Sequence, residues 1–323
     1  MADAAGWSTI ESDEGLFTSL VENLGVKGIQ FEELISLDPD TIRSLGTVYG
    51  VIFLFKYLRQ QPATTTSSST TTTSNLPDGT PTPTSTLPET FFFANQTIQN
   101  ACGTQAILSI LLNHDTPSPE NNNTPISLGP ELSSFKDFTT GFPSDLRGEA
   151  LSNSEGIRTA HNAFARSSPF VDETSRPQND DEEGDVYHFI AYTPVNGVLY
   201  ELDGLQGAPI SHGECDAGSF PEKVIEVLRR RIARYPETET RFNLMAVVKD
   251  LRVRAGEVGD LEALRGEERK RAGWAWENSL RRSNFVGFIG GVLKGVTAGK
   301  EKEGKVEEWV KKAEGETARR LRR

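Results

Sequence analysis

The segment NQTIQNACGTQAILSILLN, residues 95–113, carries the most specific pattern in the chain. Apolar residues recur at helical spacing from Ala101 to Asn113, so this part predicts a buried helix with Cys102 in its first turn. A thiol in that position faces the positive end of the helix dipole and free backbone N–H groups, which favour the nucleophilic thiolate. Taken alone, Cys102 could as well be an inert core residue, because unpaired cysteines are commonly buried.

A second polar residue of the same segment favours the catalytic interpretation. Gln96 lies six residues before Cys102. This spacing can place its side-chain amide beside the thiol, where it would stabilise the oxyanion of a tetrahedral intermediate. Papain-like thiol proteases have a similar separation between a glutamine and the catalytic cysteine. In isolation Gln96 is more often an ordinary loop amide, and a base with its orienting carboxylate must come from elsewhere in the fold.

A predicted β-hairpin supplies that base and carboxylate. Residues 186–193 and 198–202 are rich in aromatic and β-branched side chains and flank Pro-Val-Asn-Gly, a strong hairpin signal. With Asn-Gly as a two-residue turn, the pairing places His188 opposite Leu205. Asp203 is then a diagonal neighbour of His188 on the same face of the sheet. A register shift of one residue would instead place the two side chains on opposite faces.

The other patterns along the chain mix helices with antiparallel strands. We expect helices around Leu16, Leu20 and Leu24, from Phe31, from Asp40 to Leu45, at two places within 130–165 with the second from Ser154, and at 221–235, and strands at 48–58 and 242–248. This mixture indicates an α+β fold rather than a doubly wound parallel sheet.

Residues 61–89 differ from the rest of the chain because they are almost wholly Thr, Ser and Pro. A segment without aromatic residues or periodicity cannot bury enough surface to offset the entropy lost on ordering it, so we expect a disordered insertion. A phosphorylated regulatory loop is the alternative to a plain spacer. A second stretch without periodicity, increasingly acidic, lies between Ser167 and Asp185.

The charge of the chain is divided between two parts. Residues 1–255 carry 18 basic against 34 acidic side chains, and residues 256–323 carry 16 against 12, so the net charges are −16 and +4. An acidic body disfavours nucleic acid as the main ligand, because phosphate contacts need clustered Lys and Arg. The longest apolar run near the end, residues 285–296, is shorter than the roughly 20 residues of a spanning helix, so we expect no membrane segment.

The cysteines and histidines outside the candidate site predict no further chemistry. Two cysteines and the absence of a cleavable apolar leader indicate a reducing compartment and disfavour a disulfide framework. We expect a cytoplasmic and nuclear location. The spacing of Cys and His forms no metal-ligand motif, so neither a metal nor another cofactor is expected. We interpret Cys215 as structural, and His114, His161 and His212 as structural or solvated, the last in a loop flanked by glycine.

Several long blocks, in the same order, resemble the ubiquitin carboxyl-terminal hydrolases of the papain-like superfamily. The blocks are WSTIESDEGLFTSLVENLGVKG from Trp7, NQTIQNACGTQAI from Asn95, HFIAYTPVNGVLYELDGLQGAPISHG from His188 and FNLMAVVKD from Phe242. The resemblance implies a knotted fold with a central antiparallel sheet flanked by helices. It also implies Cys102 as nucleophile, His188 as general base and acid, Asp203 as the residue that orients the histidine, and Gln96 as the oxyanion stabiliser.

The same resemblance divides the chain and suggests partners. It implies a catalytic domain at residues 1–255, with a crossover loop over the active site at residues 166–186. Residues 256–323 would form a helical extension with a basic tail, since the block 270–296 resembles the C-terminal extension of the proteasome-associated subgroup. In that subgroup the extension binds the adaptor domain of a proteasomal ubiquitin receptor. The expected partners are therefore ubiquitin, its conjugates and that receptor.

These patterns predict a thiol hydrolase that cleaves bonds at the C-terminal glycine of ubiquitin through a thioester intermediate. Two rival functions stay open at this point. Cys–His–Asp chemistry also serves other thiol acyl-transfer enzymes, such as transglutaminases and acetyltransferases. The second rival is a non-enzymatic ubiquitin-binding subunit of the proteasome, against which the four candidate site residues argue.

Overall fold

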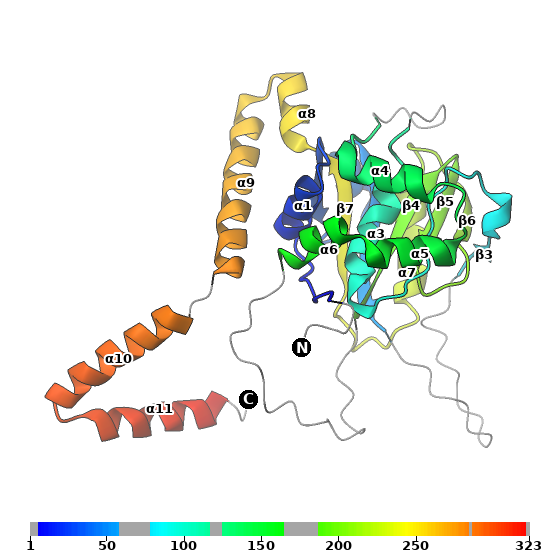
Figure 1. Ribbon diagram of the computed structural model, residues 1–323. Helices are drawn as coiled ribbons and strands as arrows, with labels where there is room; N and C mark the ends of the chain where they lie inside the picture. Colours follow the sequence, from blue (N-terminus) through cyan, green and yellow to red (C-terminus); the bar gives the residue numbers. More distant parts are fainter. Residues whose placement is uncertain (1–5, 58–77, 117–124, 165–186, 284–285, 321–323) are drawn as a thin grey trace, which may run out of the picture.

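The computed structural model describes residues 6–57, 78–116, 125–164, 187–283 and 286–320 (Figure 1). The predicted crossover loop, residues 166–186, lies outside these ranges. The helices are α1 Glu14–Asn23, α2 Pro39–Ser44, α3 Cys102–Leu111, α4 Gly129–Thr139, α5 Ser144–Asn153, α6 Glu155–Asn162, α7 Phe220–Ile232, α8 Leu251–Val258, α9 Leu261–Arg282, α10 Val286–Lys302 and α11 Val306–Arg320. The strands are β1 Ile29–Glu33, β2 Val48–Lys56, β3 Thr80–Pro81, β4 Tyr187–Val195, β5 Val198–Leu202, β6 Ile210–Glu214 and β7 Asn243–Lys249.

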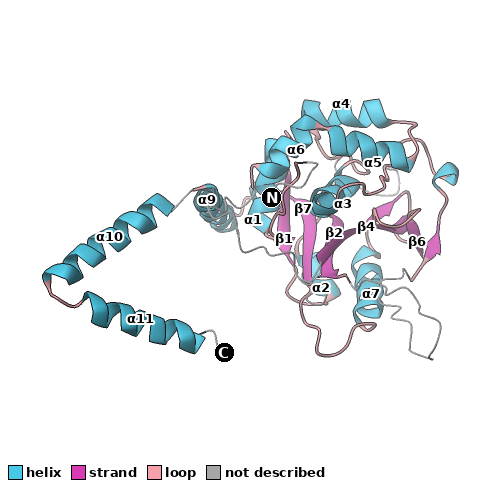
Figure 2. Cartoon of the chain, turned by 60° about the horizontal axis from the view of Figure 1, so that its bottom comes forward, coloured by secondary structure: helices cyan, strands magenta, loops and turns pink. Residues whose placement is uncertain are grey.

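One antiparallel sheet organises the described residues, with the strand order β1-β7-β2-β4-β5-β6-β3. Helices cover both of its faces, α1 and α3 to α6 on one and α2 and α7 on the other (Figure 2). The central strand β4 is therefore buried along nearly its whole length. The predicted α+β class, an antiparallel sheet flanked by helices, is confirmed. The knotted path stays a prediction.

The N-terminal helix α1 forms where the leucine spacing predicts it. Asp13 caps it, since its carboxylate accepts a hydrogen bond from the Leu16 N–H at 2.7 Å. Leu16, Leu20 and Phe17 are fully buried against the sheet. Burial of each such side chain contributes roughly 1.5–3 kcal/mol, so α1 is held mainly by packing.

Two predictions for the N-terminal half are wrong. The helix expected from Phe31 is the strand β1, because Phe31 pairs with Val247 of β7, a partner that is remote in sequence. The helix expected from Asp40 begins at Pro39, and its cap is Asp38, whose side chain accepts from the Asp40 N–H. Proline suits the first helical position because the missing N–H has no partner there.

Two further segments also differ from expectation. Residues 130–165 hold three helices instead of two, because the chain leaves helical geometry between Thr140 and Pro143, where Gly141 adopts a φ of +78°. In the predicted disordered insertion, residues 78–89 are ordered, and β3 adds the last strand to the sheet edge by pairing with β6. Residues 61–77 lie outside the described ranges.

The helix α9 packs against α1. Trp274 is buried over Gly15 of α1, where an added Cβ would lie 2.4 Å from the indole Cγ. Asn278 is also buried, and its side-chain amide donates to the Gly15 carbonyl at 3.1 Å and to Ser19 Oγ at 2.8 Å. The small surface of Gly15 and these hydrogen bonds dock α9 on α1.

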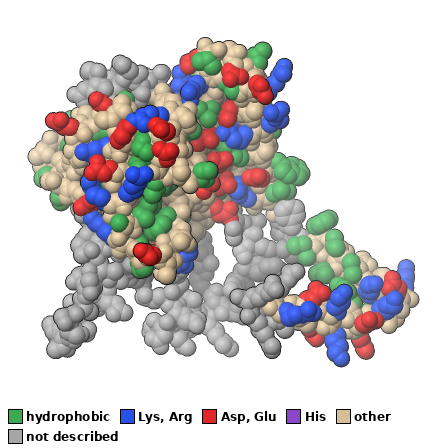
Figure 3. Space-filling model, turned by 180° about the vertical axis from the view of Figure 1, so that it is seen from behind, with side chains coloured by type: hydrophobic (Ala, Val, Ile, Leu, Met, Phe, Trp, Pro, Cys, Tyr) green, Lys and Arg blue, Asp and Glu red, His purple; other side chains and the backbone are tan. Residues whose placement is uncertain are grey.

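The helices α10 and α11 lie apart from the sheet and its flanking helices (Figure 1). Apolar side chains gather on α10 and are exposed to solvent, as Figure 3 shows. No described helix is long and apolar enough to span a bilayer.

Candidate active site

Cys102 is the first residue of α3 and is 9 % exposed. No side chain caps this end of α3 among the described residues, because the N-cap position is held by Ala101. The N–H groups of the first turn therefore have no side-chain acceptor among the described residues. An uncapped N-terminus stabilises negative charge on sulfur and on a substrate oxygen beside it.

The hairpin that carries the histidine has the predicted register. Val195 pairs with Val198, and Asn196 and Gly197 both adopt positive φ angles, +50° and +75°. Such angles are those of a type I′ turn, whose twist matches that of the two strands. The prediction that His188 stands opposite Leu205 is wrong, since β5 ends at Leu202 before the pairing extends that far.

His188 instead pairs across the sheet with Phe55 of β2. Its Nε2 lies 2.7 Å from Oδ1 of Asp203, the residue that directly follows β5. The Cys102 thiol is close enough to the same imidazole to contribute to its raised pKa, and because Nε2 faces Asp203, Nδ1 is the ring nitrogen left for the thiol. The rings of Phe55 and Tyr57 stand edge-on to the imidazole, with centroids 5.8 Å away in both cases.

The surroundings of His188 and Asp203 shift the pKa values of these two residues in opposite directions. Burial lowers the pKa of His188, but the hydrogen bonds and charges of Asp203 and Cys102 outweigh burial and raise it to about 9. Burial raises the pKa of Asp203, but the hydrogen bond and charge of His188 and the Leu205 N–H outweigh it and lower the pKa. At neutral pH the histidine therefore carries a proton and the aspartate a negative charge.

Gln96 lies in the segment before α3, next to the residue that follows Asp203. Its backbone N–H donates to the carbonyl of Gly204, the residue after Asp203, at 2.7 Å. The fold thus brings Gln96, Cys102, His188 and Asp203 together from three separate parts of the sequence. This set has the composition of a thiol acyl-transfer site with an oxyanion donor.

Two residues close to the site were not predicted. Gln105, one turn after Cys102 on α3, is buried and donates to the Ala94 carbonyl at 2.5 Å. Gly204 lies against both Gln105 and Gln96. The only sequence signal for Gln105 is a polar residue on a helix that is otherwise apolar on that side.

The other histidines and the second cysteine have structural environments. His114 hydrogen-bonds Thr193, and burial lowers its pKa to about 4. His161 lies between Thr104 and the Ser8 carbonyl, and burial lowers its pKa. Cys215 is buried, which raises the pKa of its thiol to about 11.

One of these environments differs from the prediction. His212 lies in strand β6 and not in a loop, because residues 210–214 pair with β5, and its Nε2 is 3.2 Å from Glu201 Oε2. The described residues contain no group of three His, Cys, Asp or Glu side chains that could hold a metal ion. That the chain needs no cofactor stays a prediction.

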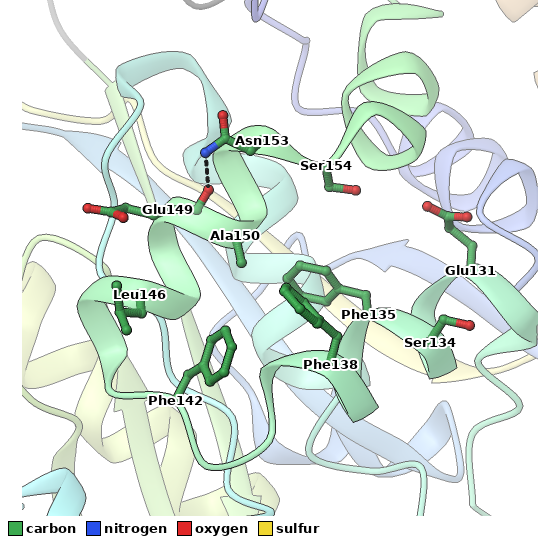
Figure 4. Close-up of a pocket in the computed structure, with 10 residues that line it drawn as sticks. All are labelled: Glu131, Ser134, Phe135, Phe138, Phe142, Leu146, Glu149, Ala150, Asn153 and Ser154. Carbon is green, nitrogen blue, oxygen red and sulfur yellow. Dashed lines mark hydrogen bonds between the residues drawn. The ribbon is translucent and has the colours of Figure 1, made fainter.

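A surface pocket lies between α4 and α5, away from these residues (Figure 4). Phe135, Phe138 and Phe142 line one part of it, and Leu146 and Ala150 of α5 line another. It contains none of the four candidate site residues, so it is a separate surface feature.

Comparison with known proteins identifies the family. The model of ubiquitin carboxyl-terminal hydrolase family 1 matches residues 7–233, and a model described as ubiquitin carboxyl-terminal hydrolases matches residues 258–300. Ubiquitin carboxyl-terminal hydrolase 2 of Schizosaccharomyces pombe is 48% identical over 289 residues, which cover 88% of each chain. Ubiquitin carboxyl-terminal hydrolase isozyme L5 of Dictyostelium discoideum is 42% identical over 250 residues, 77% of this chain and 64% of that protein.

A solved structure supports the same assignment. The catalytic domain of Trichinella spiralis UCH37 bound to ubiquitin vinyl methyl ester is 38% identical, with a TM-score of 0.59, and the match covers 76% of this chain and 96% of that one. The family model over residues 7–233 and this structure give the same family assignment. The chain belongs to the ubiquitin carboxyl-terminal hydrolase family and is a cysteine-type deubiquitinase.

Proposed function

We propose that this enzyme cleaves the bond after the C-terminal glycine of ubiquitin through a thioester on Cys102, and that it acts with the proteasome. The observation that carries the catalytic part is the His188–Asp203 pair at 2.7 Å, with the Cys102 thiol close enough to the same imidazole to help raise its pKa. The pair supplies a positioned proton donor, and the helix terminus favours a thiolate beside it.

In the first half of the reaction the Cys102 thiolate attacks the carbonyl carbon of the ubiquitin C-terminal glycine. The carbonyl electron pair moves to oxygen, and the Gln96 amide and the N–H groups at the start of α3 stabilise the resulting oxyanion. As the C–N bond breaks, His188 gives its proton to the leaving amine. The products are a thioester on Cys102, a free amine and a neutral imidazole.

In the second half water replaces the amine. Neutral His188 takes a proton from the water as its oxygen attacks the thioester carbon, and a second oxyanion forms at the same donors. The C–S bond then breaks, which releases the ubiquitin C-terminus as a carboxylic acid and restores the thiolate beside the imidazolium; the acid loses its proton to solvent. Asp203 keeps its charge throughout and holds the imidazole in the orientation that serves both steps.

Hydrolysis of ubiquitin with a C-terminal aminocoumarin amide tests the catalytic proposal. Cys102→Ala is expected to lose turnover by more than about 10³-fold, because the covalent route is closed. Cys215→Ala is the matched control and is expected to keep turnover, since this thiol is buried away from the site. Full turnover by Cys102→Ala, or a product that forms only when an amine acceptor is added, would reject the proposal.

The proposed association with the proteasome rests on the extension. The exposed apolar side chains of α10 recur at intervals of one, three and four residues and so share one face. They are Phe288, Ile289, Val292, Leu293 and Val296, with exposed fractions from 38% to 70%. An apolar helix face of this kind fits a groove on a partner protein. We take that partner to be the adaptor domain of a proteasomal ubiquitin receptor, which puts the enzyme in the cytoplasm and the nucleus.

Charge substitutions on α10 test this association in the full chain. The double variant Phe288→Asp with Leu293→Asp is expected to lose co-purification with proteasomes while it keeps hydrolysis of the aminocoumarin substrate. Lys294→Asp, on the opposite face of the same helix, is the control and is expected to keep both. Unchanged co-purification of the double variant would overturn the proposal for α10 without affecting the catalytic assignment.

A further inference from the structure

Gln105 links the helix of the nucleophile to the segment of the oxyanion donor. It lies one turn after Cys102 on α3 and is 5 % exposed. Its Nε2 donates to the carbonyl of Ala94 at 2.5 Å, and Ala94 is two residues before Gln96. A buried amide that donates to a backbone carbonyl fixes the separation of the two segments, because losing the bond would leave that carbonyl buried without this donor.

Gly204 meets both Gln96 and Gln105, and these three residues form a junction of three chain segments. The Gly204 carbonyl accepts the Gln96 N–H at 2.7 Å. An added Cβ at Gly204 would lie 2.1 Å from Gln105 Nε2 and 2.9 Å from Gln96 Cβ, so the three segments approach closely only around a glycine. Because Gly204 directly follows Asp203, the junction joins the immediate neighbours of the nucleophile, the oxyanion donor and the orienting carboxylate.

The segment that carries Gln96 is held on its other side by α5. The Asn95 N–H donates to the Ser144 carbonyl at 2.8 Å, and Thr97 Oγ1 donates to the Gly148 carbonyl at 3.3 Å. Gly148 also lies close enough that an added Cβ would meet the Asn95 carbonyl oxygen. Residues 95–97 are thus clamped against α5, and Gln105 is the side chain that ties the same segment to α3.

We propose that Gln105 is a positioning residue for the oxyanion donor: its amide, packed against Gly204, sets the place of the Gln96 side chain relative to Cys102. The inference rests on the proposed function, since it takes Gln96 as a donor to the oxyanion. A preorganised donor loses its effect when it is displaced by a fraction of an ångström to an ångström. Gln105 therefore matters in steps that form an oxyanion and not in the reactivity of the thiolate itself.

Two reactions of Cys102 separate these effects. Hydrolysis of the ubiquitin aminocoumarin amide forms an oxyanion, whereas alkylation by iodoacetamide displaces iodide at saturated carbon and forms none. Gln105→Met keeps the side-chain volume and removes the donor. We expect it to lower kcat about 10- to 100-fold, less than the roughly 10²- to 10³-fold loss on removing an oxyanion donor, and to leave the alkylation rate of Cys102 within about 2-fold.

Thr104→Val is the matched control for this substitution. Thr104 precedes Gln105 on α3 and is fully buried. Its hydroxyl hydrogen-bonds His161 Nδ1 at 2.7 Å, and this contact does not involve the segment of Gln96. Loss of this bond is expected to lower stability but to leave both rates within about 3-fold. Gly204→Ala provides a second variant at the junction, with the same split between hydrolysis and alkylation expected as for Gln105→Met.

A double-mutant cycle with Gln96→Ala decides the outcome. If Gln105 acts through Gln96, then Gln105→Met lowers kcat by less than about 2-fold in the Gln96→Ala background. The same factor in both backgrounds, or alkylation that falls in parallel with hydrolysis, would overturn the inference and leave the proposed function intact. Full turnover by Gln96→Ala alone would instead remove Gln96 from the proposed mechanism, and the inference with it.

Discussion

His188 Nε2 and Asp203 Oδ1 lie 2.7 Å apart although the hairpin ladder does not pair their positions. The ladder between β4 and β5 ends with Ala191 opposite Leu202, and Asp203 is the first residue beyond it. The same carboxylate oxygen accepts the Leu205 N–H at 2.9 Å. The turn after β5 thus aims the carboxylate at the imidazole, and the sheet fixes the imidazole.

The pH dependence of catalysis follows from this pair. The raised pKa of His188 predicts that kcat/KM stays high through neutral pH and falls on an alkaline limb near pH 9, where the imidazolium loses its proton. Asp203→Asn removes the charge that raises this pKa, while burial still lowers it. The alkaline limb of Asp203→Asn is therefore expected at lower pH. Its kcat/KM at the pH optimum is expected to be lower by about 10²-fold or more. Profiles from pH 5 to pH 10.5 check this, and an unmoved limb in Asp203→Asn would contradict it.

The same pKa shift links stability to pH. A histidine whose folded-state pKa is raised contributes stability that is fully present below about pH 6.5 and is lost as pH rises through about 9. We expect the free energy of unfolding to fall by on the order of 1–3 kcal/mol between pH 6 and pH 9.5, since one pKa unit corresponds to about 1.4 kcal/mol. Urea titrations measure it. His188→Gln is the control, and an equal fall in that variant would assign the effect to other groups.

A buried ion pair on the same face of the sheet as His188 predicts a large loss of stability, since Arg231 lies over the ring of Phe55, which also contacts His188. Arg231 Nη1 lies 2.5 Å from Glu201 Oε1, and both side chains are almost fully buried. Tyr192 and His212 contact the other oxygen of the same carboxylate at 3.2 Å. Arg231→Met leaves Glu201 buried without its cation, so we expect unfolding to become easier by about 3–5 kcal/mol.

The exposed Arg230 is the matched control for Arg231. Its side chain is 44% exposed and contacts Glu226 at 2.6 Å and Asp78 at 2.8 Å, both partly exposed, so Arg230→Met is expected to cost roughly 0–1 kcal/mol. Urea unfolding of both variants measures the difference. Equal small losses would show that the Glu201–Arg231 pair contributes no more than a surface contact.

The docking of α9 can be tested through Trp274. Trp274→Ala removes a buried side chain over Gly15 and is expected to cost about 3–5 kcal/mol of the local packing free energy. Limited proteolysis should then cleave near α9 in the variant while the catalytic body resists. Trp276→Ala, whose side chain is 66% exposed on the same helix, should keep the wild-type pattern. Equal protection in both variants would contradict the packing role of Trp274.

The parts of the site that rest on local spacing could be predicted from sequence. The helix at Cys102 and the Val195–Val198 register depend on residues within a few positions of one another. The contact of His188 with Asp203 followed from that register, although the residue opposite His188 did not, because no residue spacing marks the end of β5 at Leu202.

Contacts between distant segments could not be predicted in this way. β1 was mistaken for a helix because its partner β7 lies more than 200 residues away, and only that pairing selects the extended form. The sequence signal for Gln105 is weak, because Gly204, the residue that it contacts, is brought beside it only by the fold. The roles of the four candidate site residues stay predictions until they are measured.

Trapping with ubiquitin that carries a C-terminal vinyl methyl ester tests the central claim most directly. The electrophile reports on a thiol only when ubiquitin is bound and the thiol lies at its C-terminus. We expect one adduct per chain, mapped by mass spectrometry to Cys102, which is absent in Cys102→Ala and retained in Cys215→Ala. An adduct on Cys215, or an adduct that persists in Cys102→Ala, would contradict the assignment of Cys102 as the nucleophile.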